Sequence, residues 1–417
     1  MSEITTYEKT KDSGIEWIGS VPSHWRVHTL YQLVTQVKEK NSNLQEKNLL
    51  SLRYGKIKRK DIDSPDGLLP ASFDGYNIIE DGDIVLRLTD LQNDHTSLRV
   101  GLATERGIIT SAYTTLRPIN TSNSKYLYYL LHAFDLKKGF YGMGSGVRQG
   151  LNYAEVKELR VVLPGQDEQN AIVRFLDNQC GQIDSIIEEA KSSIEEYKKW
   201  RASIIFEAVT KGLNPLAEMK DSHIDWIGLV PSHWKLSRIK NELDNLDYLR
   251  EPISAEKREN ILGLYDYYGA SGVIDKIDDY NVDDKVLLIG EDGANLRMRN
   301  LPLVYKAEGK FWVNNHAHIL KVHDDNCYGF IAYLLEAGDY SVFITGSAQP
   351  KLSQFNLMRF PIVIPPLVEQ QEIEAYLDEK CSAIDALIRE KKSLLSELEI
   401  YKRSLILETV TGKRKVV

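Results

Sequence analysis

Two nearly identical nonapeptides decide how this chain is organised: WIGSVPSHW at residues 17–25 and WIGLVPSHW at residues 226–234. Each copy contains two tryptophans, a proline and a glycine. Because proline fixes a turn and indole rings bury a large apolar surface, we interpret the segment as a packing device shared by two repeats. His24 and His233 belong to this device, and we expect them to make structural hydrogen bonds. The alternative is a ligand or base-stacking site.

A second pair of similar segments closes each half of the chain, since residues 159–210 align with residues 360–411. Both carry the pattern P-x(3)-E-Q-x(2)-I-x(3)-L-D, which starts at Pro164 and again at Pro365. The nonapeptides are 209 positions apart and the closing segments 201, so the second middle is eight residues shorter. Each half therefore has a similar beginning, a divergent middle and a similar end, as an internal duplication produces.

The closing segments are predicted to form long helices, because apolar residues recur at alternating spacings of four and three over about five heptads. Such a seam is typical of a coiled coil, and two equal seams in one chain are expected to pair with each other. Arg201 and Lys402 interrupt the two seams at the same repeat position. The residues predicted for this interface are Leu176, Ile183, Ile187, Ile194, Tyr197, Ile204, Leu377, Ile384, Ile388, Leu395, Leu398 and Leu405.

The divergent middles combine strand and helix patterns, which predicts a mixed α/β domain in each half. Strands are expected at residues 83–88, 112–116, 285–289 and 318–322. Helices are expected at residues 125–133 and 328–337, capped by Asn123 and Asn326. The predicted organisation is a first domain at residues 1–165, a central long helix at 166–212, a second domain at 213–366, and a C-terminal long helix with a basic tail at 367–417.

Composition is ordinary for a globular protein, with 42% apolar and 27% charged residues. We expect a cytoplasmic protein, because the chain has no apolar run of about 18 residues, no apolar N-terminal core and only three cysteines. Cys180 and Cys381 lie on the helix seams and are expected in the core. The net charge of −8 argues against a strongly basic DNA binder acting alone. Residues 53–60 nevertheless hold five basic groups and no acid.

Several catalytic signatures are missing from the sequence. It contains no G-x-x-x-x-G-K-[ST] phosphate loop, no Gly-rich fingerprint for a nucleotide or S-adenosylmethionine, and no N-P-P-Y type stretch of an adenine methyltransferase. His316 and His318 could share a strand face, but two histidines do not make a metal site. Glu291 and Asp292 could act as a carboxylate pair, but GEDGAN is more typical of a turn. We predict no catalytic residue and no metal site.

Polar loops of the divergent middles supply the candidate DNA contacts. Glycines allow a partner to approach the backbone closely, arginine can pair with guanine edges, and glutamine can pair with adenine. Residues 54–60 are expected to form a basic loop, and residues 144–149 and 346–351 occupy matching places in the two halves. The alternative is that these are solvated loops. The predicted DNA-binding residues are Tyr54, Lys56, Lys58, Arg59, Arg87, Ser145, Arg148, Gln149, Tyr268, Ser271, Asn295, Arg297, Arg299, Gln349 and Lys351.

The chain resembles the specificity subunits of type I restriction-modification enzymes over its whole length. The resemblance is carried by the paired WIG-x-VPSHW segments, the P-x(3)-E-Q closing pattern, and the helix ends AVTKG (residues 208–212) and TVTGK (residues 409–413). The second middle also resembles a target-recognition domain of that family, through YYGASGVID, LLIGEDGANL and FWVNNHAHIL.

The resemblance implies two similar target-recognition domains separated by two long helices that form an antiparallel coiled coil, with pseudo-two-fold symmetry. It implies that each domain reads one part of a bipartite double-stranded DNA target and that the helix pair sets the spacer. The implied partners are two modification (methyltransferase) subunits and, in some complexes, ATP-dependent restriction subunits. S-adenosylmethionine, ATP and Mg²⁺ are expected in those partners, with no cofactor bound by this chain and no membrane association.

Two other functions remain open at this point. A self-sufficient DNA methyltransferase or nuclease would bind S-adenosylmethionine or a metal as the isolated chain. A coiled-coil scaffold without a nucleic-acid role would give no sequence-dependent protection of DNA in a footprint.

Overall fold

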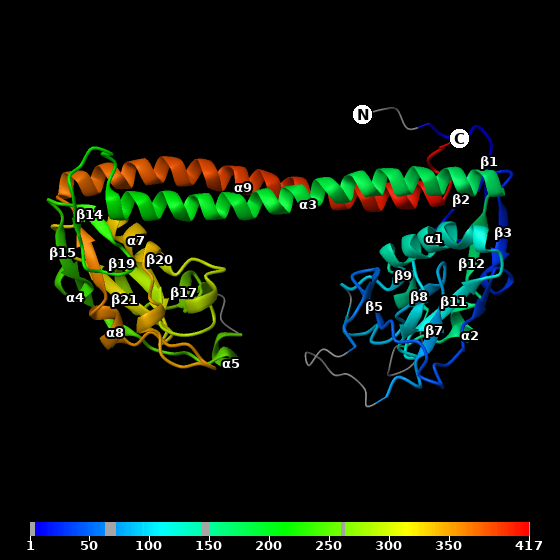
Figure 1. The fold of residues 1–417 in the computed structure, drawn as a ribbon, viewed down its shortest axis with the longest axis horizontal. Coiled ribbons are helices and arrows are strands. Elements are labelled where there is room, and N and C mark those ends of the chain that lie inside the picture. Colours follow the sequence, from blue (N-terminus) through cyan, green and yellow to red (C-terminus); the bar gives the residue numbers. More distant parts are fainter. Residues whose placement is uncertain (1–4, 63–71, 95, 144–149, 260–262, 417) are drawn as a thin grey trace. The chain divides into compact units, whose positions relative to one another are not determined.

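A computed structural model describes residues 5–62, 72–94, 96–143, 150–259 and 263–416 (Figure 1). The chain forms two compact units. Unit 1 comprises residues 1–190 together with 392–417, and unit 2 comprises residues 191–391. The unit boundaries fall inside the two long helices, α3 (Gln166–Lys211) and α9 (Leu367–Val410), so each unit contains one part of both helices.

In the residues that the structure describes, unit 1 contains short antiparallel strands and two α-helices other than α3 and α9. Its largest sheet has four strands in the order β4 (Val34–Gln36), β11 (Thr114–Pro118), β8 (Ile84–Leu86) and β9 (Val100–Leu102). Four further strand pairs are β1 (Thr10–Asp12) with β2 (Ser20–Pro22), β3 (Arg26–Thr29) with β12 (Arg160–Leu163), β5 (Leu50–Arg53) with β6 (Lys56–Arg59), and β7 (Asn77–Ile79) with β10 (Gly107–Ile109). The helices are α1 (Ser124–Leu136) and α2 (Tyr153–Val156).

Unit 2 is built around a six-stranded sheet. Its order is β16 (Leu243–Asn245), β21 (Ala317–Val322), β19 (Val282–Gly290), β20 (Val304–Val313), β17 (Tyr265–Gly269) and β18 (Gly272–Ile277). Two strand pairs repeat the framework of unit 1: β13 (Met219–Asp221) with β14 (Leu229–Pro231), and β15 (Lys235–Arg238) with β22 (Pro361–Ile364). The helices are α4 (Ile239–Glu242), α5 (Ala255–Arg258), α6 (Asn295–Met298), α7 (Tyr328–Ala337) and α8 (Gln354–Met358).

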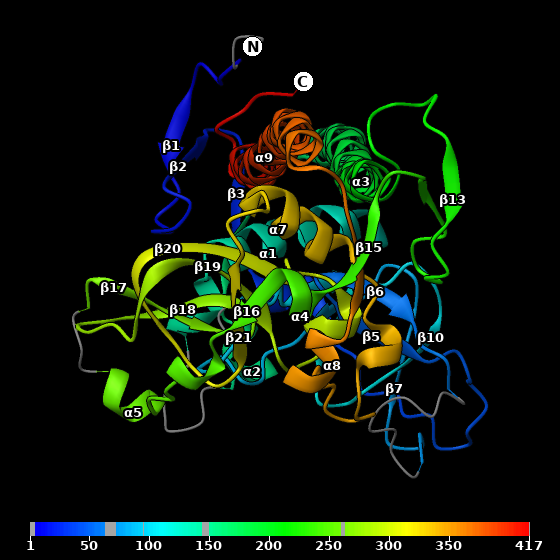
Figure 2. The same cartoon turned by 90° about the vertical axis from the view of Figure 1, so that its left-hand side faces the viewer.

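One helix in each unit joins the sheet to the long helices. In unit 1, Tyr126 and Leu130 of α1 share a core with Leu176 of α3, whereas Leu127 and Leu131 pack with the sheet strands. Figure 2 shows α7 lying between the long helices and the sheet of unit 2, where Phe330 and Leu334 belong to the central core. The mixed α/β architecture and the long helix pair confirm the fold class predicted from the sequence.

The nonapeptides close the ends of the helix pairs. In unit 1, Trp25 is fully buried, its neighbour His24 contacts Glu168 of α3 at 2.8 Å, and Gly412, just after α9, lies against Trp25. In unit 2, Trp234 is buried and donates to Glu369 of α9 at 3.1 Å, which His233 also contacts at 2.8 Å.

The end of α3 completes the same arrangement in unit 2. A Cβ at Gly212, just after α3, would lie 3.2 Å from the Trp234 ring, and Gly212 has a φ of +72° that favours glycine. The nonapeptide is therefore a packing device, and both histidines make the expected hydrogen bonds.

The helices run antiparallel within each unit. In unit 1 the start of α3 meets the end of α9, and further along Lys402 of α9 contacts Asp184 of α3 at 2.5 Å. In unit 2 Arg201 of α3 contacts Asp385 of α9 at 3.2 Å. The two polar interruptions of the seams are thus ion-paired at equivalent repeat positions.

The seam residues differ in burial. Eight predicted interface residues are buried, whereas Tyr197, Ile204, Leu395 and Leu398 are half-buried; the buried set is Leu176, Ile183, Ile187, Ile194, Leu377, Ile384, Ile388 and Leu405. Beyond Arg201 the buried position moves by one residue, to Ile205. Cys180 and Cys381 are buried in the cores of their units, as predicted.

Two predictions of local structure were wrong. Residues 54–60 do not form a loop, because β5 and β6 form a hairpin whose turn is Tyr54–Gly55. The asparagine caps are also absent. Asn123 has a helical backbone and no capping hydrogen bond, since Asn120 caps the preceding turn. Asn326 lies one residue before Cys327, the N-cap of α7, and its amide donates to Glu242, while the Gln370 side chain accepts from the backbone N–H of Cys327.

Candidate nucleic-acid interface

The β5–β6 hairpin presents the basic residues of unit 1. Tyr54 is 88% exposed and has a φ of +50°, a conformation that few non-glycine residues adopt. Together with Gly55 at +75° it makes the tight turn of the hairpin. Lys58 is exposed, and Arg59 forms a bidentate pair with Glu105 that raises the pKa of its guanidinium. Lys56 reaches back to Asp184 of α3 at 3.5 Å.

Two arginines of unit 1, Arg87 and Arg99, differ in their burial and in the groups that they contact. Arg87, a predicted DNA contact, is half-buried and lies 3.6 Å from Asp94. Arg99, which is not among the predicted residues, is fully buried and donates to the backbone oxygens of Thr89, Asp90 and Asp94. Arg99 therefore organises the loop after β8, and Arg87 is carried on that loop. The predicted contacts Ser145, Arg148 and Gln149 lie outside the described residues.

Tyr268 lies in β17 of unit 2, and Ser271 lies in the turn that joins β17 to β18. The Tyr268 ring packs edge-on against Phe311 with the centroids 5.5 Å apart, and the ring is half-buried. Burial raises the pKa of its hydroxyl. Ser271 is exposed at the turn. Tyr268 is thus fixed by packing, whereas Ser271 is accessible to a ligand.

The α6 region holds Asn295, Arg297 and Arg299. Asn295 closes its own loop, because its amide donates to Leu301 and Pro302 carbonyls at 3.2 Å. Arg299 donates to the carbonyls of Glu336 and Gly338 at the end of α7. Arg297 is exposed and donates to the Gly346 carbonyl at 3.1 Å. Both arginines line an open cleft of about 490 Å³. Of the three, Asn295 is bonded to its own loop and stabilises it.

Residues 345–351 form an exposed loop closed by reciprocal backbone hydrogen bonds of 2.8 Å between Thr345 and Lys351. Gln349 is exposed near its tip. Lys351 is also exposed, but its ammonium lies 3.0 Å from the Glu291 carboxylate. The backbone of Leu352 donates to the Glu291 carbonyl at 2.7 Å, so the base of the loop is attached to the end of β19.

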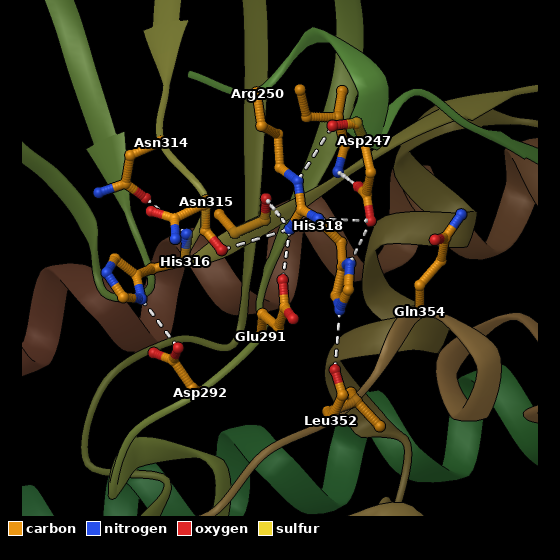
Figure 3. A network of polar contacts seen from close by, with 12 residues as sticks. Asp247, Arg250, Glu291, Asp292, Asn314, Asn315, His316, His318, Leu352 and Gln354 are labelled. Atoms are coloured by element: carbon orange, nitrogen blue, oxygen red, sulfur yellow. Dashed lines mark hydrogen bonds and ion pairs between the residues drawn. The ribbon is translucent and has the colours of Figure 1, made fainter. Parts of the chain in front are cut away.

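A buried polar network supports this loop, as Figure 3 shows. His318 has no exposed side-chain surface. Its Nδ1 lies 2.6 Å from the Asp247 carboxylate and its Nε2 lies 2.8 Å from the Leu352 carbonyl oxygen. Arg250 contacts both Asp247 and Glu291. The network thereby joins four segments that are distant in sequence.

The electrostatics of the network follow from these contacts. Burial acts to raise the pKa of Asp247, but the hydrogen bond and charge of His318 outweigh it and hold the pKa below its usual value. The pKa of Glu291 is likewise lowered, because Arg250 and Lys351 outweigh the effect of burial. Both carboxylates are therefore ionised and paired. Their role in the network is to stabilise the fold.

The two histidines do not share a ligand. His316 precedes β21, is exposed, and contacts Asp292 at 2.8 Å, whereas His318 lies within β21 and contacts Asp247. Among the residues that the structure describes, no three histidine, cysteine or acidic side chains are grouped to hold a metal ion. In the same residues no helix is both long enough and apolar enough to cross a membrane.

Sequence reasoning missed a second group of cations in unit 2. Arg238, Lys240 and Arg359 line an open cleft of about 610 Å³ with Gln354, Phe355 and Met358. The three cations come from two segments more than 100 residues apart, so no local pattern marks them. Phe355, the second residue of the short helix α8, is exposed beside these cations, which only the folded structure reveals.

Comparison with known proteins places these features in a family. The model of the type I restriction modification DNA specificity domain matches residues 73–196 and 231–397, which is more than half of the chain and touches both units. A protein of Haemophilus influenzae named as a type I restriction enzyme specificity subunit is 33% identical over 146 residues, or 35% of this chain and 36% of that protein. The MjaX specificity subunit of Methanocaldococcus jannaschii is 31% identical over 130 residues, or 30% and 29%.

The alignments with these curated relatives thus span about a third of their length. One solved structure, from work on complex assembly and conformational transition of the type I R-M system, has a TM-score of 0.67 at 14% identity. It covers 94% of this chain and 98% of its own, and at that identity the likeness concerns the fold.

Proposed function

This chain belongs to the type I restriction-modification DNA specificity family, and from that membership we propose that it is the DNA-recognition subunit of a type I restriction-modification complex. The observation that carries the proposal is the family match in both halves, on middles whose sequences differ. Two recognition domains with different sequences on a repeated framework suit an asymmetric bipartite target, in which each unit recognises one part.

The exposed donors of the two units fit this role. Unit 1 offers the turn and outer face of the β5–β6 hairpin, where Lys58 and Tyr54 are exposed. Unit 2 offers Ser271, Arg297 and the loop around Gln349. Such side chains can form hydrogen bonds with base edges in the major groove. The cationic ones among them can also bind phosphates.

The repeated framework suits two copies of one partner. Each nonapeptide makes the same histidine–glutamate contact with a long helix, since His24–Glu168 and His233–Glu369 have equal distances of 2.8 Å. We assign this surface to two modification subunits, and we assign S-adenosylmethionine, ATP and Mg²⁺ to partner subunits. In this proposal the chain itself is not an enzyme, the helix pair sets the spacer, and the complex acts on DNA in the cytoplasm.

The test is a footprint of the full chain assembled with its modification subunits, on DNA carrying the sequence that the host genome shows methylated. We expect two protected tracts separated by bases that can be changed without loss of binding. Sequence-independent protection, or none, would leave only the scaffold role. Methyl transfer from S-adenosylmethionine by the chain alone would show a self-sufficient enzyme.

A further inference from the structure

An open cleft at the edge of unit 2 collects cations outside the loops discussed above. Arg238 ends β15, Lys240 lies in α4, and Arg359 follows α8; with Gln354, Phe355 and Met358 they line about 610 Å³. The helices α4 and α8 contact each other, so the two basic segments form one surface. All three cationic side chains are on exposed residues.

These cations have no acidic partner among the described residues. The acid nearest in sequence to Lys240 is Glu242, which is buried and already bound by Lys235 and Ser237. Other lysines of unit 2 are neutralised: Lys276 by Asp266, Lys285 by Glu308 and Lys321 by Asp284. In a chain of net charge −8, three clustered and uncompensated cations create a local attraction for a polyanion.

An exposed aromatic ring lies within the same cleft. Phe355 is 65% exposed, and the Arg359 guanidinium stands 4.8 Å from its ring centroid. Stacking on the ring holds the guanidinium in place while its N–H groups remain free to bind an anion. Planar guanidinium donors match the geometry of phosphate oxygens. The arrangement is therefore suited to phosphodiester groups.

The equivalent place in unit 1 lacks this chemistry. The backbone hydrogen bond from Ile239 to Phe360 at 3.1 Å in unit 2 corresponds to that from Leu30 to Leu159 at 2.8 Å in unit 1. Around it, the positions of Arg238, Lys240, Phe355 and Arg359 are occupied by Thr29, Tyr31, Ala154 and Glu158. A partner that docks in two equal copies on the repeated framework would not find this cleft twice. The cleft instead fits a ligand that differs between the halves.

We propose that this cleft binds backbone phosphates of the DNA next to the part of the target that unit 2 reads. The proposal rests on the proposed function and adds a site to it. The position is suitable, because α8 begins three residues after Lys351, and Gln354 at its start lies beside the network that holds the loop of residues 345–351 (Figure 3). Phosphate contacts position a protein on DNA but carry no sequence information.

The experiment uses the full chain carrying the three substitutions R238Q, K240Q and R359Q together. This variant is assembled with its modification subunits. The probes are a duplex carrying the methylated target and a scrambled duplex of equal length, titrated at several salt concentrations. We expect weaker binding of both duplexes, by up to about a hundredfold at 0.15 M salt. The slope of log K against log salt should fall by up to about 2.7, at roughly 0.9 per phosphate contact, with an unchanged ratio between the duplexes.

The matched control is K276Q, K285Q and K321Q, which removes the same charge from lysines of the same unit that already have carboxylate partners. It should keep the wild-type slope. An unchanged slope in the cleft variant, a loss confined to base discrimination, or a loss of subunit assembly by mass photometry would each overturn the phosphate site. If the wild-type complex does not distinguish the two duplexes, the proposed function itself fails.

Discussion

His132 in α1 shows how a single buried side chain can make the stability of unit 1 depend on pH. Its imidazole is buried and stacks on Tyr128 with 5.7 Å between ring centroids. Burial, followed by the charges of Lys402 and Arg403, lowers its pKa to about 4. Between pH 6.5 and 4 the unfolded chain therefore binds a proton here that the folded chain does not, so folding stability falls as the pH decreases through this range.

We expect the H132F variant to lose this dependence. At pH 5 the wild type should be destabilised by about 2 kcal/mol relative to pH 7.5 through this residue, since each unit of pKa difference corresponds to about 1.4 kcal/mol. Asp135, whose pKa burial raises to about 6, acts in the opposite direction but is common to both proteins. Urea denaturation of wild type and variant at both pH values measures the difference, and parallel pH profiles would contradict the prediction.

His318 presents a different situation, because both of its ring nitrogens face oxygen acceptors. Nδ1 lies 2.6 Å from Asp247 and Nε2 lies 2.8 Å from the Leu352 carbonyl. A neutral imidazole can donate only one of these bonds. The ring therefore bridges the Asp247 carboxylate and the backbone at the base of the loop of residues 345–351.

The H318Q variant should loosen the loop of residues 345–351. Losing two buried hydrogen bonds should cost about 2–4 kcal/mol in unit 2, and base discrimination should fall roughly tenfold at the target part that unit 2 reads. Discrimination at the other part should be unchanged. H316Q serves as control, because His316 is exposed and its ring contacts Asp292 on the surface rather than the buried network. Equal losses at both parts would show that His318 does not position the loop.

The long helices contain two ion pairs at equivalent positions of the repeat, and these pairs favour one register of α3 against α9. Asp184–Lys402 and Asp385–Arg201 occupy equivalent positions, and neither pair is fully buried. Although burial acts to raise the pKa of Asp184, the hydrogen bonds and charges of Lys402 and Lys56 hold it below its usual value. Such pairs in an apolar seam favour one register of the helices over others.

We expect charge exchange to reveal this specificity. R201D or D385R alone should destabilise unit 2 by about 1–2 kcal/mol, and the double exchange should recover most of the loss. The same exchange at Asp184 and Lys402 should recover less, because Lys56 of the β5–β6 hairpin would then face a lysine. Thermal denaturation of the single and double variants measures both couplings. Additive effects in unit 2 would exclude a direct pairing.

The elements were predictable wherever a periodic pattern is local. The helix seams follow from their spacing, and α7 spans the predicted residues 328–337. The β5–β6 hairpin also had a local signal, since Leu50, Leu52 and Ile57 alternate with polar residues, but the basic composition was interpreted as a loop. The ion pairs needed the helix register, which no single segment specifies.

The candidate site was less predictable than the fold. The network of Asp247, Arg250, Glu291 and His318 joins segments that only the folded sheet brings together. Arg238 and Arg359 meet for the same reason. Four predicted DNA contacts are exposed and so accessible to a ligand: Tyr54, Lys58, Ser271 and Gln349. Their contacts with bases stay predictions.

At the scale of the whole molecule, the proposed ruler role of the helix pair can be tested by length. Inserting one heptad into both α3 and α9, at the unit boundaries 190/191 and 391/392, keeps the apolar seam on the same face. Seven residues add about 10.5 Å, so the permitted spacer should grow by about three base pairs. The two target parts should stay the same, as methylation-site sequencing would reveal. An unchanged spacer would refute the ruler role, and a four-residue insertion, which rotates the seam, should destabilise the pair.

Unit 1 is completed by Leu405, Ile406 and Val410 of α9, which belong to the same core as Trp25 and Leu176. During synthesis, the first 190 residues must therefore wait for residues 392–417 while all of unit 2, residues 191–391, is made. At 5–20 residues per second this interval is about 10–40 s. Throughout it the apolar face of the nascent N-terminal part is exposed, so a ribosome that stalls within unit 2 would leave a protein that chaperones or proteases must handle.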